Sequence, residues 1–207
     1  MNLLYLTILF PIVGFLLLAF GRDRWSENAA AIIGVGALGL SALFAAIAGY
    51  DFLTNTPEKG VFVQPLWTWL SVDGFAPTFN LHLDGLSLTM LGVITGVGFL
   101  IHLFASWYMR GETDGYARFF SYMNLFVAAM ILLVLGDNLV AVYFGWEGVG
   151  LCSYLLIGFY FRDPANGLAA RKAFIITRIG DAFMAIGLCV LYKELGTLHI
   201  ATLLEEA

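Results

Sequence analysis

Three charged residues lie well inside two long apolar stretches of this 207-residue chain, away from the ends of those stretches. Glu147 lies near the middle of the apolar run 139–161, and Arg178 and Asp181 lie inside the run 168–192. Each run is long enough to span a bilayer, which takes about 20 apolar residues. An ionised side chain at the centre of such a helix costs roughly 3 kcal/mol on insertion scales, so it usually faces a partner or an aqueous path. These residues therefore predict a route for protons or other ions.

The depth and spacing of these residues place the two acids at a similar level in the membrane. A rise of about 1.5 Å per residue places Glu147 roughly 12 Å inside the membrane, close to the level of Asp181 in the next helix. Arg178 and Asp181 are three positions apart, which places both side chains on one helix face. One interpretation is a proton carrier, because one cation for two carboxylates leaves an acid unpaired, and a low dielectric favours its protonated form. The alternative is a structural pair of Arg178 with Asp181, beside a protonated Glu147 that is hydrogen-bonded to a neighbouring helix.

Other residues in the apolar runs are weaker candidates. His102 could relay protons because imidazole titrates near neutral pH, although a lone histidine is more often packed and hydrogen-bonded. Four residues could extend a chain of hydrogen bonds between the acids or could serve helix packing: Tyr143, Ser153, Tyr154 and Thr177. We expect Cys152 and Cys189 to be small packing residues without a disulfide or a metal.

The composition is that of an integral membrane protein. Hydrophobic residues make up 60% of the chain and charged residues 12%, against about 45–50% and about 25% in ordinary soluble proteins. The apolar stretches predict an all-α polytopic protein of about six transmembrane helices in one compact bundle: 3–20, 29–50, 86–108, 119–135, 139–161 and 168–192. The G-x-G-x-x-G sequence at 34–39 lies within one of them and follows no strand, so we interpret it as close helix packing instead of a dinucleotide site.

Lys and Arg residues indicate the orientation of the chain. Only Lys59 and Lys193 lie in the second connection or the tail, whereas seven lie at the first, third and fifth connections: Arg22, Arg24, Arg110, Arg118, Arg162, Arg171 and Lys172. By the positive-inside rule these three connections are cytoplasmic, which places the N-terminus and the tail on the periplasmic side. The first apolar run lacks a basic segment before it, so we expect a span and not a cleaved signal peptide.

The second connection predicts a small extra-membrane β-hairpin. Two β-type segments, 61–63 and 66–69, precede Asp73-Gly74, which is a two-residue turn signal. In the following segment the apolar residues Phe79, Leu81 and Leu83 alternate with polar ones. We expect prolines to interrupt the connection at Pro57, Pro65 and Pro77. The tryptophans of the hairpin are expected either to anchor at the membrane surface or to bind a partner subunit.

These features divide the chain into four parts. Two N-terminal transmembrane helices occupy 1–50, and the periplasmic hairpin connection occupies 51–83. Four further transmembrane helices occupy 84–193, and a periplasmic-side tail at 194–207 ends in acidic residues.

Several motifs resemble one family. The sequence GWEGVGLCSYLLIGF at 145–159, followed by TRIGD at 177–181, resembles the subunit L family, the antiporter-like membrane subunits of bacterial respiratory NADH:quinone oxidoreductase (complex I). DGLSLTM at 84–90, the run 102–110 and RDRWSEN at 22–28 also look like that family, so the resemblance covers essentially the whole chain.

The resemblance implies a proton-translocating subunit of the membrane arm, driven by NADH oxidation and quinone reduction elsewhere in the complex, with no redox centre of its own. It implies that NADH, flavin, iron–sulfur clusters and quinone are bound by partner subunits. The expected partners are other complex I subunits, chiefly the neighbouring antiporter-like subunit, and the lipids of the bacterial inner membrane, with no nucleic acid. In this family the glutamate of G-W-E-G, here Glu147, is the proposed proton carrier, and the aspartate of T-R-I-G-D, here Asp181, is a second functional acid.

The chain differs from the family pattern in its length. Family members continue through two inverted repeats, and the helix with a lysine that modulates the glutamate follows the last span found here. The resemblance therefore implies either the N-terminal part of a longer subunit or a truncated product without a complete channel. Two alternatives remain: a subunit of a multisubunit sodium/proton antiporter, which shares the fold, and a membrane scaffold that conducts nothing.

Overall fold

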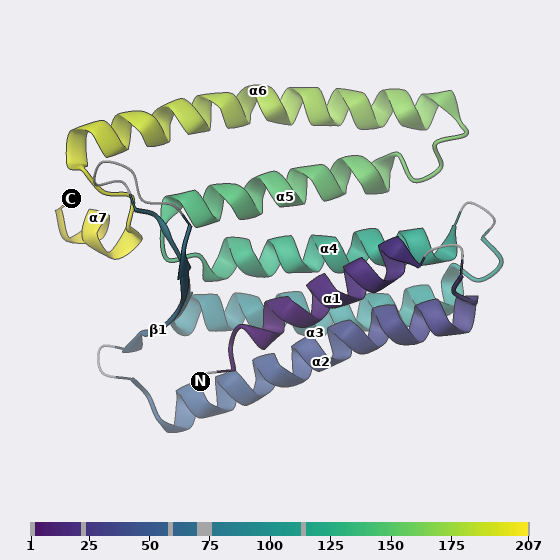
Figure 1. Cartoon of the computed structure of the whole chain (residues 1–207), viewed down its shortest axis with the longest axis horizontal. Helices are drawn as coiled ribbons and strands as arrows, with labels where there is room; N and C mark the ends of the chain where they lie inside the picture. Colours follow the sequence, from purple (N-terminus) through teal and green to yellow (C-terminus); the bar gives the residue numbers. More distant parts are fainter. Residues whose placement is uncertain (1–2, 22–23, 58–59, 70–75, 113–114, 207) are drawn as a thin grey trace.

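The computed structural model describes residues 3–21, 24–57, 60–69, 76–112 and 115–206. Long helices lie side by side along one direction, and a small β-hairpin and a short helix lie at one end of the bundle (Figure 1). The described elements are α1 (Leu6–Phe20), α2 (Glu27–Thr54), β1 (Phe62–Thr68), β2 (Thr78–Leu83), α3 (Gly85–Tyr108), α4 (Tyr116–Leu135), α5 (Leu139–Ile157), α6 (Pro164–Leu195) and α7 (Ile200–Glu206). The predicted fold class, an all-α polytopic protein with a hairpin after the second helix, is confirmed.

Five helices are long and apolar enough to cross a membrane, namely α2 to α6 within the described residues. α1 is also apolar but has 15 residues, which corresponds to a length of about 22 Å. It begins at Leu6 because residues 3–5 form a turn, from which the Tyr5 N–H donates to Gln64 of β1 at 3.0 Å. About six membrane helices were predicted, and the structure agrees, with α1 as the short one.

Capping residues set the helix limits that the apolar runs predict only roughly. The Asp163 carboxylate accepts from the Ala165 N–H and Pro164 follows it, so α6 begins four residues earlier than the predicted run 168–192. The helix ends before Gly196, whose φ of +70° is the left-handed conformation that glycine tolerates. At the start of α3, Asp84 and Ser87 form a reciprocal capping box.

The β-hairpin forms as predicted, with one difference. β1 and β2 pair antiparallel, and Leu81 and Leu83 of β2 are buried at 1% and 0% exposure. Pro65 does not interrupt β1, contrary to the prediction, because it lies where the register shifts between Pro65 and Trp67, an irregularity that tolerates proline. The predicted turn at Asp73-Gly74 lies outside the described residues.

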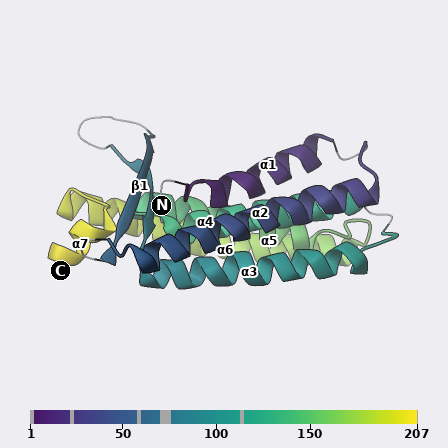
Figure 2. The same ribbon diagram turned by 90° about the horizontal axis from the view of Figure 1, so that it is seen from below.

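Apolar packing is concentrated in α1 to α4. One cluster of buried residues joins α2, α3, α4 and β2, and a second joins α1 to α4 at the opposite end of the bundle. α5 packs on α4, and α6 packs on α5 at the edge of the bundle (Figures 1 and 2). The buried residues of α6 are Ala170 and Asp181, in a helix of 32 residues. A carboxylate is therefore one of the two residues that this long helix buries.

Candidate functional site

The structure brings Glu147, Arg178 and Asp181 together between α5 and α6. An Arg178 guanidinium nitrogen, Nη1, forms an ion pair with Glu147 Oε2 and lies 3.2 Å from Asp181 Oδ2. The other terminal nitrogen, Nη2, donates to the backbone carbonyl of Glu147 at 3.1 Å. The side chain of Asp181 is 8% exposed, and those of Arg178 and Glu147 are 25% and 28% exposed. One guanidinium therefore bridges two carboxylates on neighbouring helices.

Two aromatic residues of α5 fix Asp181 in this cluster. The indole N–H of Trp146 donates to Asp181 Oδ1 at 2.8 Å, and the Tyr143 hydroxyl donates to the Asp181 backbone carbonyl at 3.4 Å. Both carboxylate oxygens of Asp181 are thus occupied, one by Trp146 and the other by Arg178. The sequence motif contains Trp146, but its role depends on how α5 is rotated against α6, which the sequence alone does not define.

Small residues on α5 make the close approach possible. A Cβ atom on Gly145 would lie 2.6 Å from the Leu133 backbone nitrogen, and one on Gly148 would lie 2.9 Å from the Ala129 Cβ of α4. On the other side, a Cβ on Gly150 would lie 3.3 Å from Arg178 Nη2. The three glycines therefore let α5 pack against α4 while leaving room for the guanidinium.

The charge balance of the cluster allows one exchangeable proton. With both acids ionised, two carboxylates and one guanidinium carry a net charge of −1, so one bound proton makes the cluster neutral in a medium where net charge is costly. The sequence predicted that one acid would remain unpaired. In the structure Arg178 contacts both acids at once, so that prediction was wrong. Arg178 is also placed by Phe174, whose ring centroid lies 4.5 Å from the guanidinium carbon.

His102 lies apart from this cluster. It is on α3, which packs on α2 and α4, and α4 lies between α3 and α5 (Figure 1). The side chain is fully buried, with Nδ1 2.9 Å from the Gly98 carbonyl, and Nε2 has no partner within the described structure. Since a carbonyl only accepts, Nδ1 carries a proton and donates it to the Gly98 carbonyl. A relay role for His102 stays a prediction.

Among the other polar candidates, Thr177 makes contacts within its own helix. It donates to the carbonyls of Ala173 and Phe174, at 3.1 and 2.9 Å. Both cysteines are free thiols, Cys152 buried and Cys189 exposed. In the described part of the chain, no group of three or more His, Cys, Asp or Glu residues is arranged to hold a metal ion.

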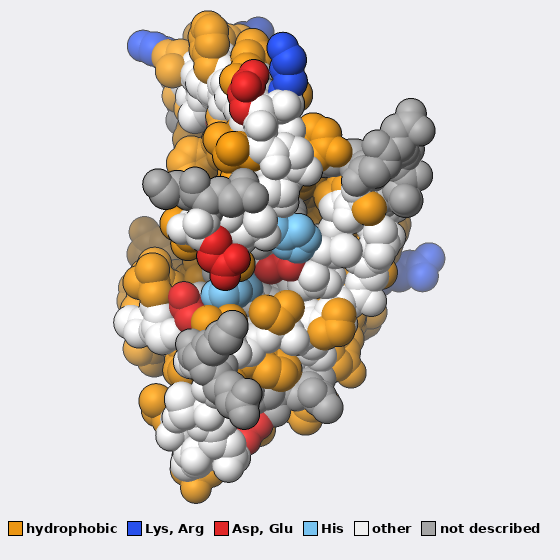
Figure 3. Space-filling view, turned by 90° about the vertical axis from the view of Figure 1, so that its left-hand side faces the viewer, with side chains coloured by type: hydrophobic (Ala, Val, Ile, Leu, Met, Phe, Trp, Pro, Cys, Tyr) orange, Lys and Arg blue, Asp and Glu red, His pale blue; other side chains and the backbone are white. Residues whose placement is uncertain are grey.

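A polar cluster at the hairpin end positions the start of α5, and the sequence analysis missed it. Asp137 accepts from Asn80 of β2 and from Asn138, both at 2.7 Å, and His199 Nδ1 lies 3.6 Å from the same carboxylate. Asn138 also caps α5 and donates to the Thr78 carbonyl at 2.6 Å. Acidic and histidine side chains gather in the middle of this end (Figure 3). An Asx residue before an apolar run is the signal that could have revealed the cap.

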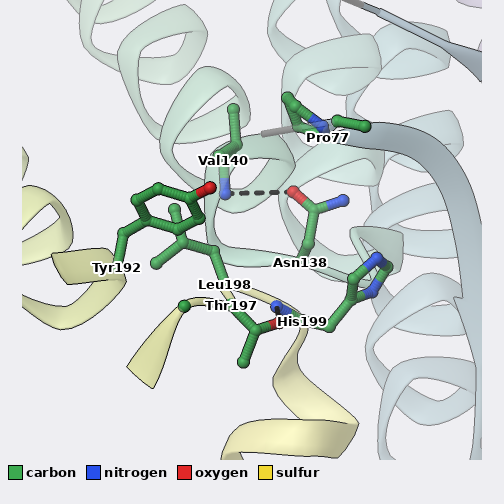
Figure 4. Close-up of a pocket in the computed structure, with 9 residues that line it drawn as sticks. Pro77, Asn138, Val140, Tyr192, Thr197, Leu198 and His199 are labelled. Carbon is green, nitrogen blue, oxygen red and sulfur yellow. Dashed lines mark hydrogen bonds between the residues drawn. The ribbon is translucent and has the colours of Figure 1, made fainter. Parts of the chain in front are cut away.

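This cluster borders a cavity of about 120 Å³. Figure 4 shows Tyr192 of α6 beside Val140 of α5, with Asn138 and His199 on the far side. The cavity therefore lies between the hairpin, the start of α5 and the connection from α6 to α7. These contacts join the hairpin to the start of α5, and the start of α5 to the connection that follows α6.

The fold and the cluster define a class: multi-pass membrane proteins in which a bundle of apolar helices holds charged residues at mid-span. Residues 69–120 match the family model described as NADH-Ubiquinone oxidoreductase (complex I), chain 5 N-terminus. Residues 136–207 match the model described as NADH:quinone oxidoreductase/Mrp antiporter, TM.

Curated relatives identify the family to which the chain belongs. NADH-quinone oxidoreductase subunit L of Pseudomonas aeruginosa is 65% identical over 100% of this chain and 34% of the relative, and that of Escherichia coli is 63% identical over 100% and 33%. The chain belongs to the subunit L family of NADH-quinone oxidoreductase. It spans about a third of the length of the curated relatives it matches.

A solved structure shares the fold at low identity. A chain in the structure of the Mrp complex from Dietzia sp. superposes with a TM-score of 0.76 at 22% identity, covering 96% of this chain and 20% of that one. The likeness shows that the two chains share a fold over this region.

Proposed function

We propose that this chain is a proton-translocating part of the membrane arm of NADH:quinone oxidoreductase, in which Glu147 carries protons, Asp181 is the second acid of the path and Arg178 is their shared charge partner. The contact of one guanidinium with both carboxylates is the observation that carries the proposal. Membership in the subunit L family supports it, because NADH-quinone oxidoreductase activity is named for those relatives.

The geometry suggests different roles for the two acids. Asp181 is nearly buried and has a partner on each carboxylate oxygen, so its side chain is held in one position. Glu147 is more exposed, and its carboxylate has Arg178 as its ion-pair partner. When Glu147 takes up a proton, its attraction to Arg178 falls, while Asp181 and the Glu147 carbonyl continue to hold the guanidinium. Glu147 is then the group that exchanges protons.

Several further assignments belong to this proposal. The chain has no redox centre of its own; NADH, flavin, iron–sulfur clusters and quinone are bound by partner subunits, among which the neighbouring antiporter-like subunit is the chief contact. The location is the bacterial inner membrane. The hairpin end of the bundle faces the periplasm, as supported by Lys and Arg residues at the connections of the opposite end (Figure 1).

A substitution in the full complex tests the proposal. In inside-out vesicles, Glu147→Gln removes the exchangeable proton at nearly constant shape, and proton uptake per NADH oxidised should fall. Glu194→Gln is the matched control, since Glu194 is exposed at the end of α6. Unchanged uptake per NADH in Glu147→Gln would refute the role of Glu147.

A second candidate is a subunit of a multisubunit sodium/proton antiporter. It is supported by the match of residues 136–207 to a model that includes Mrp antiporters and by the shared fold. The driving force distinguishes the two: an antiporter exchanges protons for sodium ions along a cation gradient without NADH or quinone. Exchange in vesicles that lack NADH, lost on Glu147→Gln, would favour this candidate.

A further inference from the structure

Arg118 occupies a cavity at the end of the bundle opposite the hairpin. The cavity measures about 220 Å³ and is bordered by the start of α4, the end of α5 and the start of α6. Two aromatic rings hold the guanidinium carbon, Phe159 at 4.9 Å and Phe161 at 4.8 Å from their centroids. One terminal nitrogen donates to the Phe159 carbonyl at 3.1 Å. The cation is therefore fixed in place and is not a mobile surface side chain.

The hydrogen bonding of Arg118 is incomplete. Its Nε is buried and has no acceptor within the described structure, and no described carboxylate pairs with this guanidinium. A buried charged N–H without an acceptor is costly, so such a group usually marks a missing partner. Tyr122 and Tyr154 line the same cavity. Neither hydroxyl forms a hydrogen bond with another described residue. Among its described lining residues, the cavity thus offers hydrogen-bond donors and no carboxylate.

The surroundings favour an anion at membrane-surface depth. Arg118 is the third residue of α4, and Phe159 follows the end of α5 by two residues. Arg171 and Lys172 are exposed in the early part of α6 at the same end. The nearby acids are already engaged, Glu112 by the Tyr160 hydroxyl at 3.1 Å and Asp163 by the Ala165 N–H at 2.9 Å. Basic pockets between helices at this level suit phosphate groups of lipids.

We propose that this cavity binds a phosphate group, that of an anionic phospholipid in the membrane leaflet on this side. The phosphate oxygens accept from Arg118 Nε and from the tyrosine hydroxyls, while the aromatic rings keep the guanidinium in place. The site is separate from the cluster of Glu147, Arg178 and Asp181, and it does not depend on the proton role of that cluster.

Lipid retention by the full complex tests the site. Phosphatidylglycerol is titrated into delipidated complex, and the lipid bound to this subunit is counted by native mass spectrometry. Arg118→Gln should weaken binding about tenfold or more, since hydrogen bonds to charged groups are typically worth roughly that factor. Lys193→Gln, which removes an exposed basic residue in the last turn of α6 at the hairpin end, should bind like the wild type.

Two further measurements complete the test. Competition with inorganic phosphate distinguishes a lipid phosphate from free phosphate, and labelling of the wild-type complex gives a result even if the variant fails to assemble. Inorganic phosphate that displaces the lipid, or binds as tightly, would assign the site to free phosphate; no effect of phosphate assigns it to lipid. On the wild-type complex, a photoreactive phosphatidylglycerol should label peptides containing Arg118 or Phe161. Labelling only elsewhere, or equal lipid binding by wild type and Arg118→Gln, would overturn the proposal.

Discussion

Two regions of the molecule are held together in different ways. α1 to α4 bury two apolar clusters that include fully buried leucines of several helices, such as Leu38 and Leu91. α6 buries Ala170 and Asp181, and its contacts with α5 include the hydrogen bonds of Arg178, Trp146 and Tyr143 beside the ring contact of Tyr154 with Phe174. Apolar packing thus dominates among α1 to α4, whereas charges and hydrogen bonds add to the packing between the two helices that hold the proposed proton site. The second kind of contact can change with protonation, and the first cannot.

The largest effect is expected at Arg178. Arg178→Gln leaves two carboxylates without their cation, and loss of one partner of a buried ion pair costs about 3–5 kcal/mol. The lower part of that range applies because a quarter of the side chain is exposed. We expect proton uptake to be lost and α6 to loosen, which limited proteolysis of the purified complex would detect. Arg171→Gln, exposed two turns earlier on α6, should change neither; equal effects of both would contradict the comparison.

A second prediction concerns the close packing of α5 against α4. Gly145→Ala places a methyl group 2.6 Å from the Leu133 backbone, which overpacks α5 against α4 at a cost of about 1–3 kcal/mol. Less subunit should remain in the assembled complex on native gels. Gly180→Ala is the control, because the added methyl group would meet no described atom within 4 Å beyond the nearby backbone of its own helix. A loss of assembly on Gly180→Ala instead would mean that α6 packs differently.

Trp146→Phe sharpens the comparison by removing one hydrogen bond within the charge cluster. A hydrogen bond to a charged group contributes about 1.5–3 kcal/mol, so Asp181 should be less well fixed and proton uptake per NADH should fall in part. Trp107→Phe, at a position that is 72% exposed, is the matched control. Full proton uptake by Trp146→Phe would show that proton transfer does not depend on the hydrogen bond from the indole to Asp181.

The smallest effect concerns the cap of α3, within the group of helices α1 to α4. Burial opposes ionisation of the Asp84 carboxyl, but hydrogen bonds from Ser87 and the nearby His82 outweigh it and hold the pKa of Asp84 below its ordinary value. Its stabilisation is therefore complete above the ordinary pKa of about 3.9 and is lost as the pH falls through the lowered pKa.

Two substitutions at this cap separate the hydrogen bond from the charge. Asp84→Ala should cost about 1 kcal/mol at neutral pH, whereas Asp84→Asn keeps a good cap and loses only the pH dependence. The temperature at which the subunit dissociates from the purified complex is measured as a function of pH, from about pH 3 to about pH 7. A pH dependence that persists in Asp84→Asn would assign it to another group.

The sequence predicted the helices well and their contacts only in part. Long apolar runs are sufficient for membrane helices, and alternation at Leu81 and Leu83 was sufficient for β2. The start of α6 was misplaced because hydropathy ignores the cap of Asp163 and Pro164. Glu147, Arg178 and Asp181 could be grouped by depth and spacing. The contact of Trp146 with Asp181 depends on the rotation of one helix against another, which no local pattern encodes.

The most direct test of the central claim compares three variants of the full complex in inside-out vesicles: Glu147→Gln, Asp181→Asn and the double variant. If both acids and Arg178 form one unit with one exchangeable proton, the double variant should lower proton uptake per NADH no more than the more severe single variant. Losses that add would mean two independent sites. Normal uptake by the double variant would contradict the account altogether and leave this part of the chain as a scaffold.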